Sequence, residues 1–110
     1  MKYIIYVGNL KTITVECIKG METALVGNEE IIEFLVGKKE VAMVWEDSLS
    51  SVRCKGKVDI LNGNTIVDIK TTQDASFEAF RRSAYKYGYN RQAAFYLDGF
   101  GAKEFVFIVI

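Results

Sequence analysis

The hydrophobic pattern of the second half of the chain predicts β-strands joined by short turns. Apolar and polar residues alternate over residues 40–46, 52–61 and 64–70, which is the period of a half-buried strand. A near-continuous apolar run at residues 104–110 (EFVFIVI) is typical of a strand buried on both faces. Residues 2–7 (KYIIYV) are rich in β-formers and predict either a strand or an ordered lead-in.

Helical spacing and capping residues predict the remaining elements. Apolar residues recur at near-helical spacing over residues 14–25, and Asn28 is placed to cap a second helix that ends before Gly37. The order of elements is one or two helices, three strands, a helix and a strand. This order predicts a single domain with a mixed α/β or α+β layer.

The helix before the last strand is predicted to begin at residue 76, with Asp74 or Ser76 as its cap. Gly99 is expected to end this helix, because glycine is common just after a helix. Gly88 interrupts the helical pattern, so a kink or a break into two helices is expected there.

The dipeptide Asn62-Gly63 lies between two alternating runs and predicts a two-residue hairpin loop. In that register Leu61 faces Asn64, and Asp59 and Asp68 are diagonal neighbours. Side chains then separate into two faces, because alternate residues of a strand share a side. The charged face carries Lys57, Asp59, Asp68 and Lys70, and the core face carries Val58, Ile60, Val67 and Ile69.

The paired acids suit a hard divalent cation. Carboxylates whose Cβ atoms lie about 7–8 Å apart can share one ion, with ligand oxygens ~2.0–2.1 Å from magnesium. Lys70, one strand step beyond Asp68, is placed to reach a phosphate oxygen or an attacking water. This layout suits metal-assisted phosphodiester hydrolysis, in which the metal neutralises the phosphate and lowers the pKa of a bound water. A solvated charged face gives the same pattern, and the pattern alone leaves both interpretations open.

The predicted helix that follows mixes basic and aromatic residues, which suits a nucleic-acid backbone and its bases. The alternative is an amphipathic helix with aromatic residues in the core and basic residues in water. Gln92 and Tyr96 are one helical turn apart and share a face, so they are either surface packing or two groups directed at one site. The candidate DNA-binding residues are Thr71, Thr72, Arg81, Arg82, Lys86 and Arg91.

Composition and charge narrow the possible functions. Net charge is zero, but residues 1–50 hold five Lys/Arg against eight Asp/Glu, whereas residues 51–110 hold nine against six. The absence of histidine excludes His-dependent zinc sites and Ser-His or Cys-His nucleophiles. No apolar run approaches the roughly 18–20 residues of a membrane span, and the start does not read as a signal peptide. We therefore expect a cytoplasmic protein that is not bound to a membrane.

The segments CKGKVDIL, NTIVDIKTTQDASFEAF and YGYNRQAAFYLDG together resemble the PD-(D/E)XK nuclease superfamily and, more narrowly, the RecE-type phage and prophage exonucleases. The resemblance covers about residues 40–108. It includes the Tyr-Gly-Tyr break and a Gln-x-x-x-Tyr helix followed by Asp-Gly. Val58 stands where the superfamily has proline, no histidine motif lies upstream, and residues 1–13 do not resemble the family. We expect one nuclease-like domain, shortened at both ends relative to related enzymes.

This resemblance implies a restriction-endonuclease-like core, in which a mixed sheet is built from a three-stranded antiparallel meander, a helix and a further strand, with flanking helices. It also implies magnesium or manganese as the cofactor. The implied site residues are Asp59, Asp68 and the Ile69 carbonyl as metal ligands, Lys70 as the catalytic lysine, and Gln92 with Tyr96 beside them.

The function expected from the resemblance is a metal-dependent DNA exonuclease that acts on the ends of linear double-stranded DNA. A homo-oligomer and a single-strand annealing partner protein are the expected assemblies. One alternative is a catalytically silent module that binds DNA or mediates assembly, and another is an endonuclease or junction resolvase on the same fold. Core motifs do not separate these activities. Glu46, at the end of the first predicted strand of the meander, is a further candidate acidic ligand.

Overall fold

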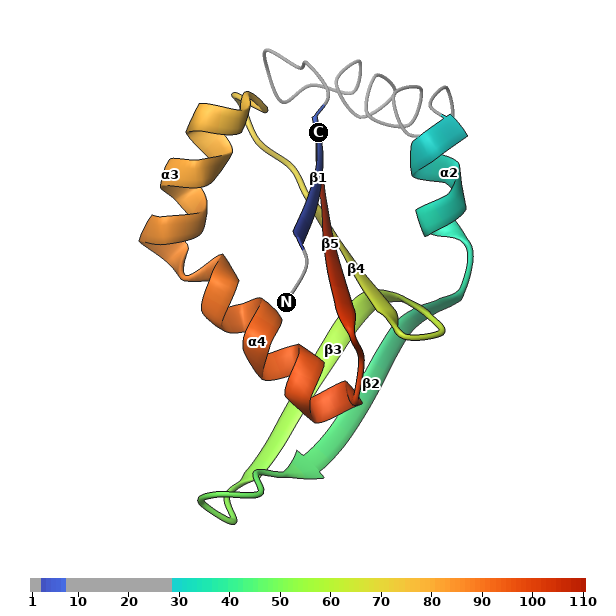
Figure 1. The fold of residues 1–110 in the computed structure, drawn as a ribbon, viewed down its shortest axis with the longest axis vertical. Coiled ribbons are helices and arrows are strands. Elements are labelled where there is room, and N and C mark those ends of the chain that lie inside the picture. The colour runs from blue at the N-terminus through green and yellow to red at the C-terminus, as the bar shows by residue number, and fades with distance from the viewer. Residues whose placement is uncertain (1–2, 8–28) are drawn as a thin grey trace.

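The computed structural model describes residues 3–7 and 29–110, which form a mixed five-stranded sheet flanked by helices (Figure 1). The strand order is β1-β5-β4-β3-β2. Strands β2, β3 and β4 form an antiparallel meander, and β5 runs parallel to both β4 and β1. The elements are β1 (Tyr3–Val7), α2 (Glu29–Leu35), β2 (Lys38–Glu46), β3 (Arg53–Asn62), β4 (Thr65–Lys70), α3 (Phe77–Tyr87), α4 (Tyr89–Phe100) and β5 (Glu104–Val109).

This arrangement confirms the predicted restriction-endonuclease-like core of meander, helix and strand. The N-terminal run is a strand, and it pairs with β5 at the edge of the sheet. The predicted helix over residues 14–25 and its neighbour Asn28 lie outside the described residues. Within the described part of the chain, no helix is both long enough and apolar enough to cross a bilayer.

The sheet separates two hydrophobic clusters, one on each of its faces. Helices α3 and α4 cover one face, here called the α4 face, and α2 lies on the opposite side, the α2 face (Figure 1). Strand β5 supplies alternate residues to both clusters, and residues 105–110 are all buried. The hydrophobic effect therefore fixes β5, and β4 beside it, as the centre of the fold.

The hairpin between β3 and β4 is shifted by one residue from the predicted position. Asn62 pairs with Thr65, so the loop residues are Gly63 and Asn64 rather than Asn62 and Gly63. Gly63 takes a positive φ of 57°, and glycine is favoured at the first central position of a type II′ turn. Leu61 accordingly faces Ile66 rather than Asn64.

A local distortion of β3 places on opposite faces two residues that were predicted to share the core face. Val58 packs in the cluster on the α4 face, whereas Ile60, only two residues later, packs with Val67 on the α2 face. The regular alternation of β3 is therefore broken at Asp59. Its neighbour in the register, Glu40, has a positive φ of 51°, and these two residues are skipped between the pairs Lys39–Ile60 and Val41–Val58.

The helical region divides as predicted at Gly88. This residue has a left-handed φ of 69°, it caps the end of α3, and α4 begins at the next residue. Ser76 caps the start of α3, because its side chain accepts a hydrogen bond from Ala79 N. The prediction that Gly99 ends the helix is wrong, because α4 continues to Phe100 and is capped by Gly101. Gly99 instead allows close approach of the Trp45 ring, which leaves no room for a Cβ atom there.

Candidate metal-dependent active site

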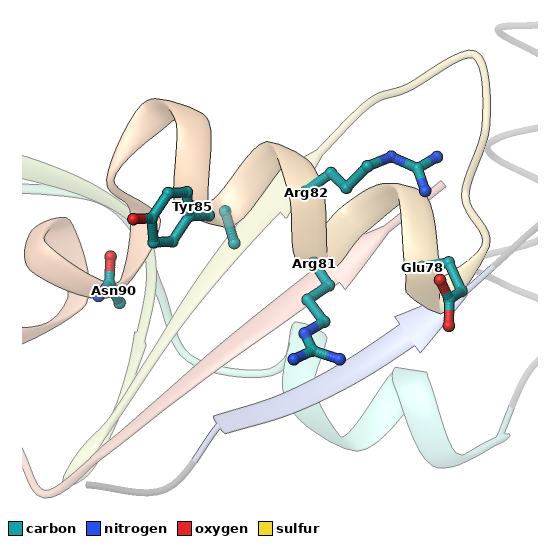
Figure 2. A pocket seen from close by; sticks show the side chains of 6 residues that line it. Glu78, Arg81, Arg82, Tyr85 and Asn90 are labelled. Carbon is teal, nitrogen blue, oxygen red and sulfur yellow. The ribbon is translucent and has the colours of Figure 1, made fainter.

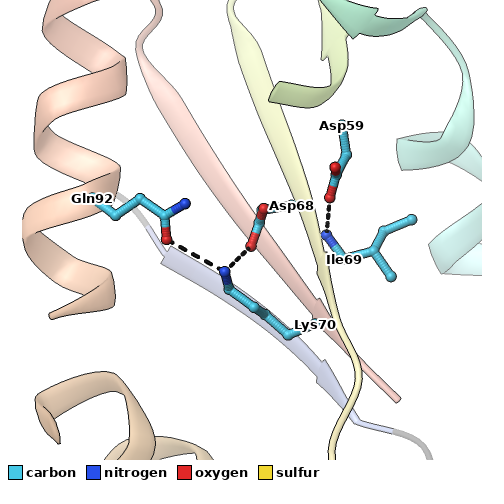
Figure 3. Close-up of polar contacts among 5 residues, drawn as sticks. All are labelled: Asp59, Asp68, Ile69, Lys70 and Gln92. Carbon is cyan, nitrogen blue, oxygen red and sulfur yellow. Dashed lines mark hydrogen bonds and ion pairs between the residues drawn. The ribbon is translucent and has the colours of Figure 1, made fainter. Parts of the chain in front are cut away.

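Asp59 lies where the hydrogen-bonded ladder between β3 and β4 ends. The last pair before it is Ile60 with Val67, and Asp59 Oδ2 accepts a hydrogen bond from Ile69 N at 2.9 Å (Figure 3). A side-chain oxygen thus satisfies a backbone donor of β4 that the ladder leaves unpaired. Because the bond spans the two strands, it fixes the Asp59 carboxylate beside the Asp68–Lys70 segment.

Asp68 projects toward the α4 face, beside Lys70 and Gln92 (Figure 3). Its side chain is 16% exposed, and its Oδ2 lies 2.9 Å from Lys70 Nζ. This contact is an ion pair, and within residues 3–7 and 29–110 the buried Oδ2 atom has no hydrogen-bond partner. A buried carboxylate oxygen without such a partner is costly. It therefore has capacity for a further positively charged neighbour.

The electrostatics of Asp68 reflect this environment. Burial raises the pKa of the Asp68 carboxyl above its ordinary value of 3.8. The Lys70 ammonium opposes the rise, whereas the negative charge of the nearby Asp59 carboxylate adds to it. The structure therefore brings Asp59 and Asp68 together. A cation between them would offset both the burial of Asp68 and the repulsion between the two carboxylates.

Lys70 is held between a strand and a helix. Its side chain is 22% exposed, and its ammonium lies 2.9 Å from Asp68 Oδ2 and donates to Gln92 Oε1 at 3.3 Å. Gln92 is on α4, so this contact connects the sheet to the Gln-x-x-x-Tyr helix (Figure 3). Three of the residues proposed for catalysis thus meet through their side chains.

Tyr96 is one turn further along α4 and takes a different place. Its ring packs against Gly56 of β3, at a distance that leaves no room for a Cβ atom. It also lies edge-on to Phe100, with ring centroids 6.1 Å apart. The structure therefore places Tyr96 in the packing between α4 and the sheet, next to the site.

The two threonines after Lys70 differ in their surroundings. Thr71 is exposed, whereas Thr72 is half-buried. Thr72 forms hydrogen bonds through both its hydroxyl and its backbone. The Thr72 hydroxyl accepts from Asp74 N at 3.3 Å, and Thr72 N donates to Ile110 O at 2.9 Å. These bonds fix the path from the site to the start of α3.

The basic residues of the candidate DNA surface lie on α3 and early α4, and all are exposed. Arg81 and Arg82 line an open hollow of about 610 Å³ together with Tyr85 and Asn90, and their guanidinium groups project in different directions (Figure 2). Lys86 lies over the Tyr87 ring. Arg91 lies against Gly88 instead, at the break between the two helices.

The donor set fits a hard divalent cation. Magnesium is commonly bound through one or two carboxylates, with waters completing the coordination. Asp59 and Asp68 offer such a pair, in which the buried Asp68 Oδ2 has an ionic contact with Lys70 but no hydrogen-bond partner among the described residues. Asp59 also borders an open hollow of about 480 Å³ on the α2 face, lined by Leu35 and Glu40 among others. Among residues 3–7 and 29–110, no three His, Cys, Asp or Glu side chains come together as a metal-binding group.

Glu46 does not join the pair. It faces Arg53 at the far end of the β2–β3 ribbon, which is six residues from Asp59 and therefore about 20 Å along the strand. Ile69 contacts the acids through its N–H, and its carbonyl as a metal ligand stays a prediction.

One residue of the site was missed in the sequence. The Tyr89 ring centroid lies 4.4 Å from Lys70 Nζ. The available signal was its position: it follows the break at Gly88 and precedes Gln92 by three residues, so Tyr89 and Gln92 share a helix face.

A meander with two adjacent acids and a lysine, joined to a parallel strand through a helix, defines a PD-(D/E)XK-type domain, a nuclease-type fold. The model of a family described as a PDDEXK-like domain of unknown function matches residues 3–108. The chain belongs to this family. No curated protein and no solved structure matches it. PD-(D/E)XK nucleases generally use divalent metal ions, which agrees with the donor set of Asp59 and Asp68.

Proposed function

We propose that this domain is a metal-dependent DNA exonuclease of the phage and prophage recombination type, which hydrolyses phosphodiester bonds at the ends of linear double-stranded DNA. The observation that carries the proposal is the cluster of Asp59, Asp68, Lys70 and Gln92. In it, two carboxylates and an ammonium meet at the junction of β3, β4 and α4. Exposed arginines on α3 support a nucleic-acid substrate, because they can neutralise backbone phosphates.

Each residue of the cluster has a separate task. Asp59 and Asp68 would hold magnesium or manganese. When bound, the ion would neutralise charge on the phosphate and lower the pKa of a water. The Lys70 ammonium is placed to stabilise negative charge that develops on the phosphate oxygens during attack by water. Gln92 accepts a hydrogen bond from Lys70 and so limits the positions that the ammonium can take.

The proposal is tested with linear and circular double-stranded DNA, each incubated with magnesium or manganese. We expect linear DNA to be degraded from its ends, circular DNA to survive, and chelation of the metal to stop the reaction. The Lys70→Ala variant should lower the cleavage rate by about 10²–10³-fold, as expected for one preorganised electrostatic group. Cleavage of circular DNA would instead support an endonuclease.

A second candidate function is a DNA-binding or assembly module without catalysis. It is favoured by the small donor set, because only two carboxylates come together among the described residues. This module would bind DNA with a steep salt dependence but would cleave neither substrate with either metal. The Arg81→Ala and Arg82→Ala variants should flatten the salt dependence of binding under either function.

A further inference from the structure

Among the described residues, the Lys70 ammonium has three close neighbours, and one of them is an aromatic face. Two are the polar groups of Asp68 and Gln92, and the third is the Tyr89 ring, whose centroid lies 4.4 Å from Nζ. A cation within about 6 Å of an aromatic centroid is attracted by the negative face of the ring. This attraction needs the ring and not the phenol hydroxyl.

The fold holds the Tyr89 ring firmly at this position. The ring stacks on Phe80, with centroids 5.8 Å apart, and packs against Phe107 at 5.9 Å. Phe80 and Phe107 are buried, so the support for Tyr89 comes from the hydrophobic cluster on the α4 face. Because lysine has a flexible four-carbon stem, a fixed ring beside its ammonium restricts a group that would otherwise sample many positions.

The break between α3 and α4 gives Tyr89 this orientation. Gly88 adopts the left-handed conformation and is buried, and the Arg91 guanidinium occupies the space that a Cβ atom would need. Tyr89 is the first residue of α4, and Gln92 follows three residues later on the same helix face. One rigid helix start therefore presents both the ring and the amide to Lys70.

We propose that Tyr89 is a positioning residue for Lys70, whose ring face holds the ammonium beside Asp68 and Gln92 and keeps it directed at the scissile phosphate. The inference rests on the proposed function for its catalytic consequence, but the contact itself does not depend on cleavage. Phenylalanine at position 89 should preserve the effect, whereas leucine should remove it.

The chain contains a matched pair for comparison. On the other side of Gly88, Lys86 Nζ lies 5.2 Å from the centroid of the Tyr87 ring. Tyr87 is 61% exposed, and its ring has no contact with Lys70 in the structure. Tyr87→Leu thus removes a lysine–tyrosine contact of the same kind from the same chain. The Tyr87 ring also stacks on Tyr89, with centroids 5.9 Å apart, so this control removes one neighbour of Tyr89 but keeps its buried supports Phe80 and Phe107.

The experiment combines a spectroscopic and a kinetic measurement on the full chain. Protons that lie over a ring face are shifted upfield, so the ε-methylene NMR signals of Lys70 report the contact in the metal-free protein. We expect the upfield shift in the wild type, Tyr89→Phe and Tyr87→Leu, and its loss in Tyr89→Leu. With linear DNA, Tyr89→Leu should lower kcat by about 10- to 100-fold, the scale of a small misplacement of a catalytic group, while KM changes little.

A fourth variant distinguishes the loss of the contact between the ammonium and the ring from unfolding of the protein. Replacing Tyr89 with pentafluorophenylalanine keeps the aromatic shape but reverses the charge distribution of the ring, so it should lower kcat while the protein stays folded. An unchanged kcat in both Tyr89→Leu and the fluorinated variant would overturn the proposal, as would an equal loss in Tyr89→Phe and Tyr89→Leu. If the wild type cleaves no DNA, the proposed nuclease function fails. The NMR shifts then decide alone whether Tyr89 positions Lys70.

Discussion

Asp59 and Asp68 carry the same carboxylate on neighbouring strands, but the protein holds them in different ways. Asp59 accepts a hydrogen bond from a backbone N–H of β4, so its position is tied to the main chain. Asp68 is buried with an oxygen that has only an ionic contact, and its pKa is raised mainly by burial. One acid is thus held by a hydrogen bond to the main chain, whereas the other is buried beside a single ammonium group and has capacity for a second cation.

The largest expected effect is the loss of metal binding and DNA cleavage, and it is the same for both acids. Asp59→Asn and Asp68→Asn should each abolish the heat of manganese binding and lower DNA cleavage by at least about 10²–10³-fold, because each removes a charge from the proposed metal site. Calorimetric titration and single-turnover cleavage measure the two quantities. Asp98→Asn, an exposed position on α4, is the matched control. Equal manganese heats in the wild type and Asp68→Asn would argue against a metal site.

The second effect concerns the free energy of unfolding, in which the contribution of Asp59 differs from that of Asp68. Asp59→Ala should lower the free energy of unfolding by about 1–3 kcal/mol, because it leaves Ile69 N without its acceptor. Asp59→Asn should cost much less, since its side-chain oxygen can still accept that bond. Urea unfolding of the metal-free proteins measures both values. Similar losses in the two variants would show that charge, and not the hydrogen bond, is what Asp59 contributes.

The third effect is a smaller change in the free energy of unfolding, and here the substitution is expected to stabilise the protein. Because the pKa of Asp68 is raised in the folded state, the folded protein binds this proton more strongly than the unfolded chain does. The free energy of unfolding of the metal-free protein should therefore fall as pH rises from 3.8 through the raised pKa. Asp68→Asn should lack this fall and be the more stable protein at neutral pH. Manganese should restore stability to the wild type and leave the variant unchanged.

The smallest expected effect comes from Asp74, which is fully exposed. The Ser76 N–H, and then the Ser76 hydroxyl, lower the pKa of the Asp74 carboxyl. Its stabilising contribution should thus be present above 3.8 and be lost as pH falls through the lowered pKa, the reverse of Asp68. NMR titration of the two carboxyl groups compares them directly. A raised pKa at Asp74 would contradict this assignment.

The succession of elements along residues 29–110 and the break at Gly88 were predictable from sequence, because alternation, apolar runs and glycine positions are local signals. The hairpin register was not. A loop at residues 62–63 and one at 63–64 leave every side chain of an undistorted hairpin on the same face, so the hydrophobic pattern does not distinguish them. Gly63 belongs to both possible loops: it is the second residue of a loop at 62–63 and the first residue of a loop at 63–64.

The candidate site was predictable as a set of residue types but not in its detail. The switch of faces at Asp59 lies beside Glu40 of the neighbouring strand, whose φ is positive, and a non-glycine residue gives no local sign of that conformation. Lys70 and Gln92 are far apart in the sequence, and their contact depends on how α4 packs on the sheet. Local patterns identify both residues but do not show that they meet.

The central position of β5 has a consequence for how the molecule forms. Tyr3 pairs with Phe105, so completing the sheet joins segments about a hundred residues apart, and such non-local pairing slows folding. Until β5 inserts between β1 and β4, the strand that carries Asp68 and Lys70 lacks its parallel partner, and an apolar segment is open to aggregation. Assembly of the candidate site should therefore coincide with the slowest refolding phase, which fluorescence of the aromatic residues in stopped-flow experiments would detect.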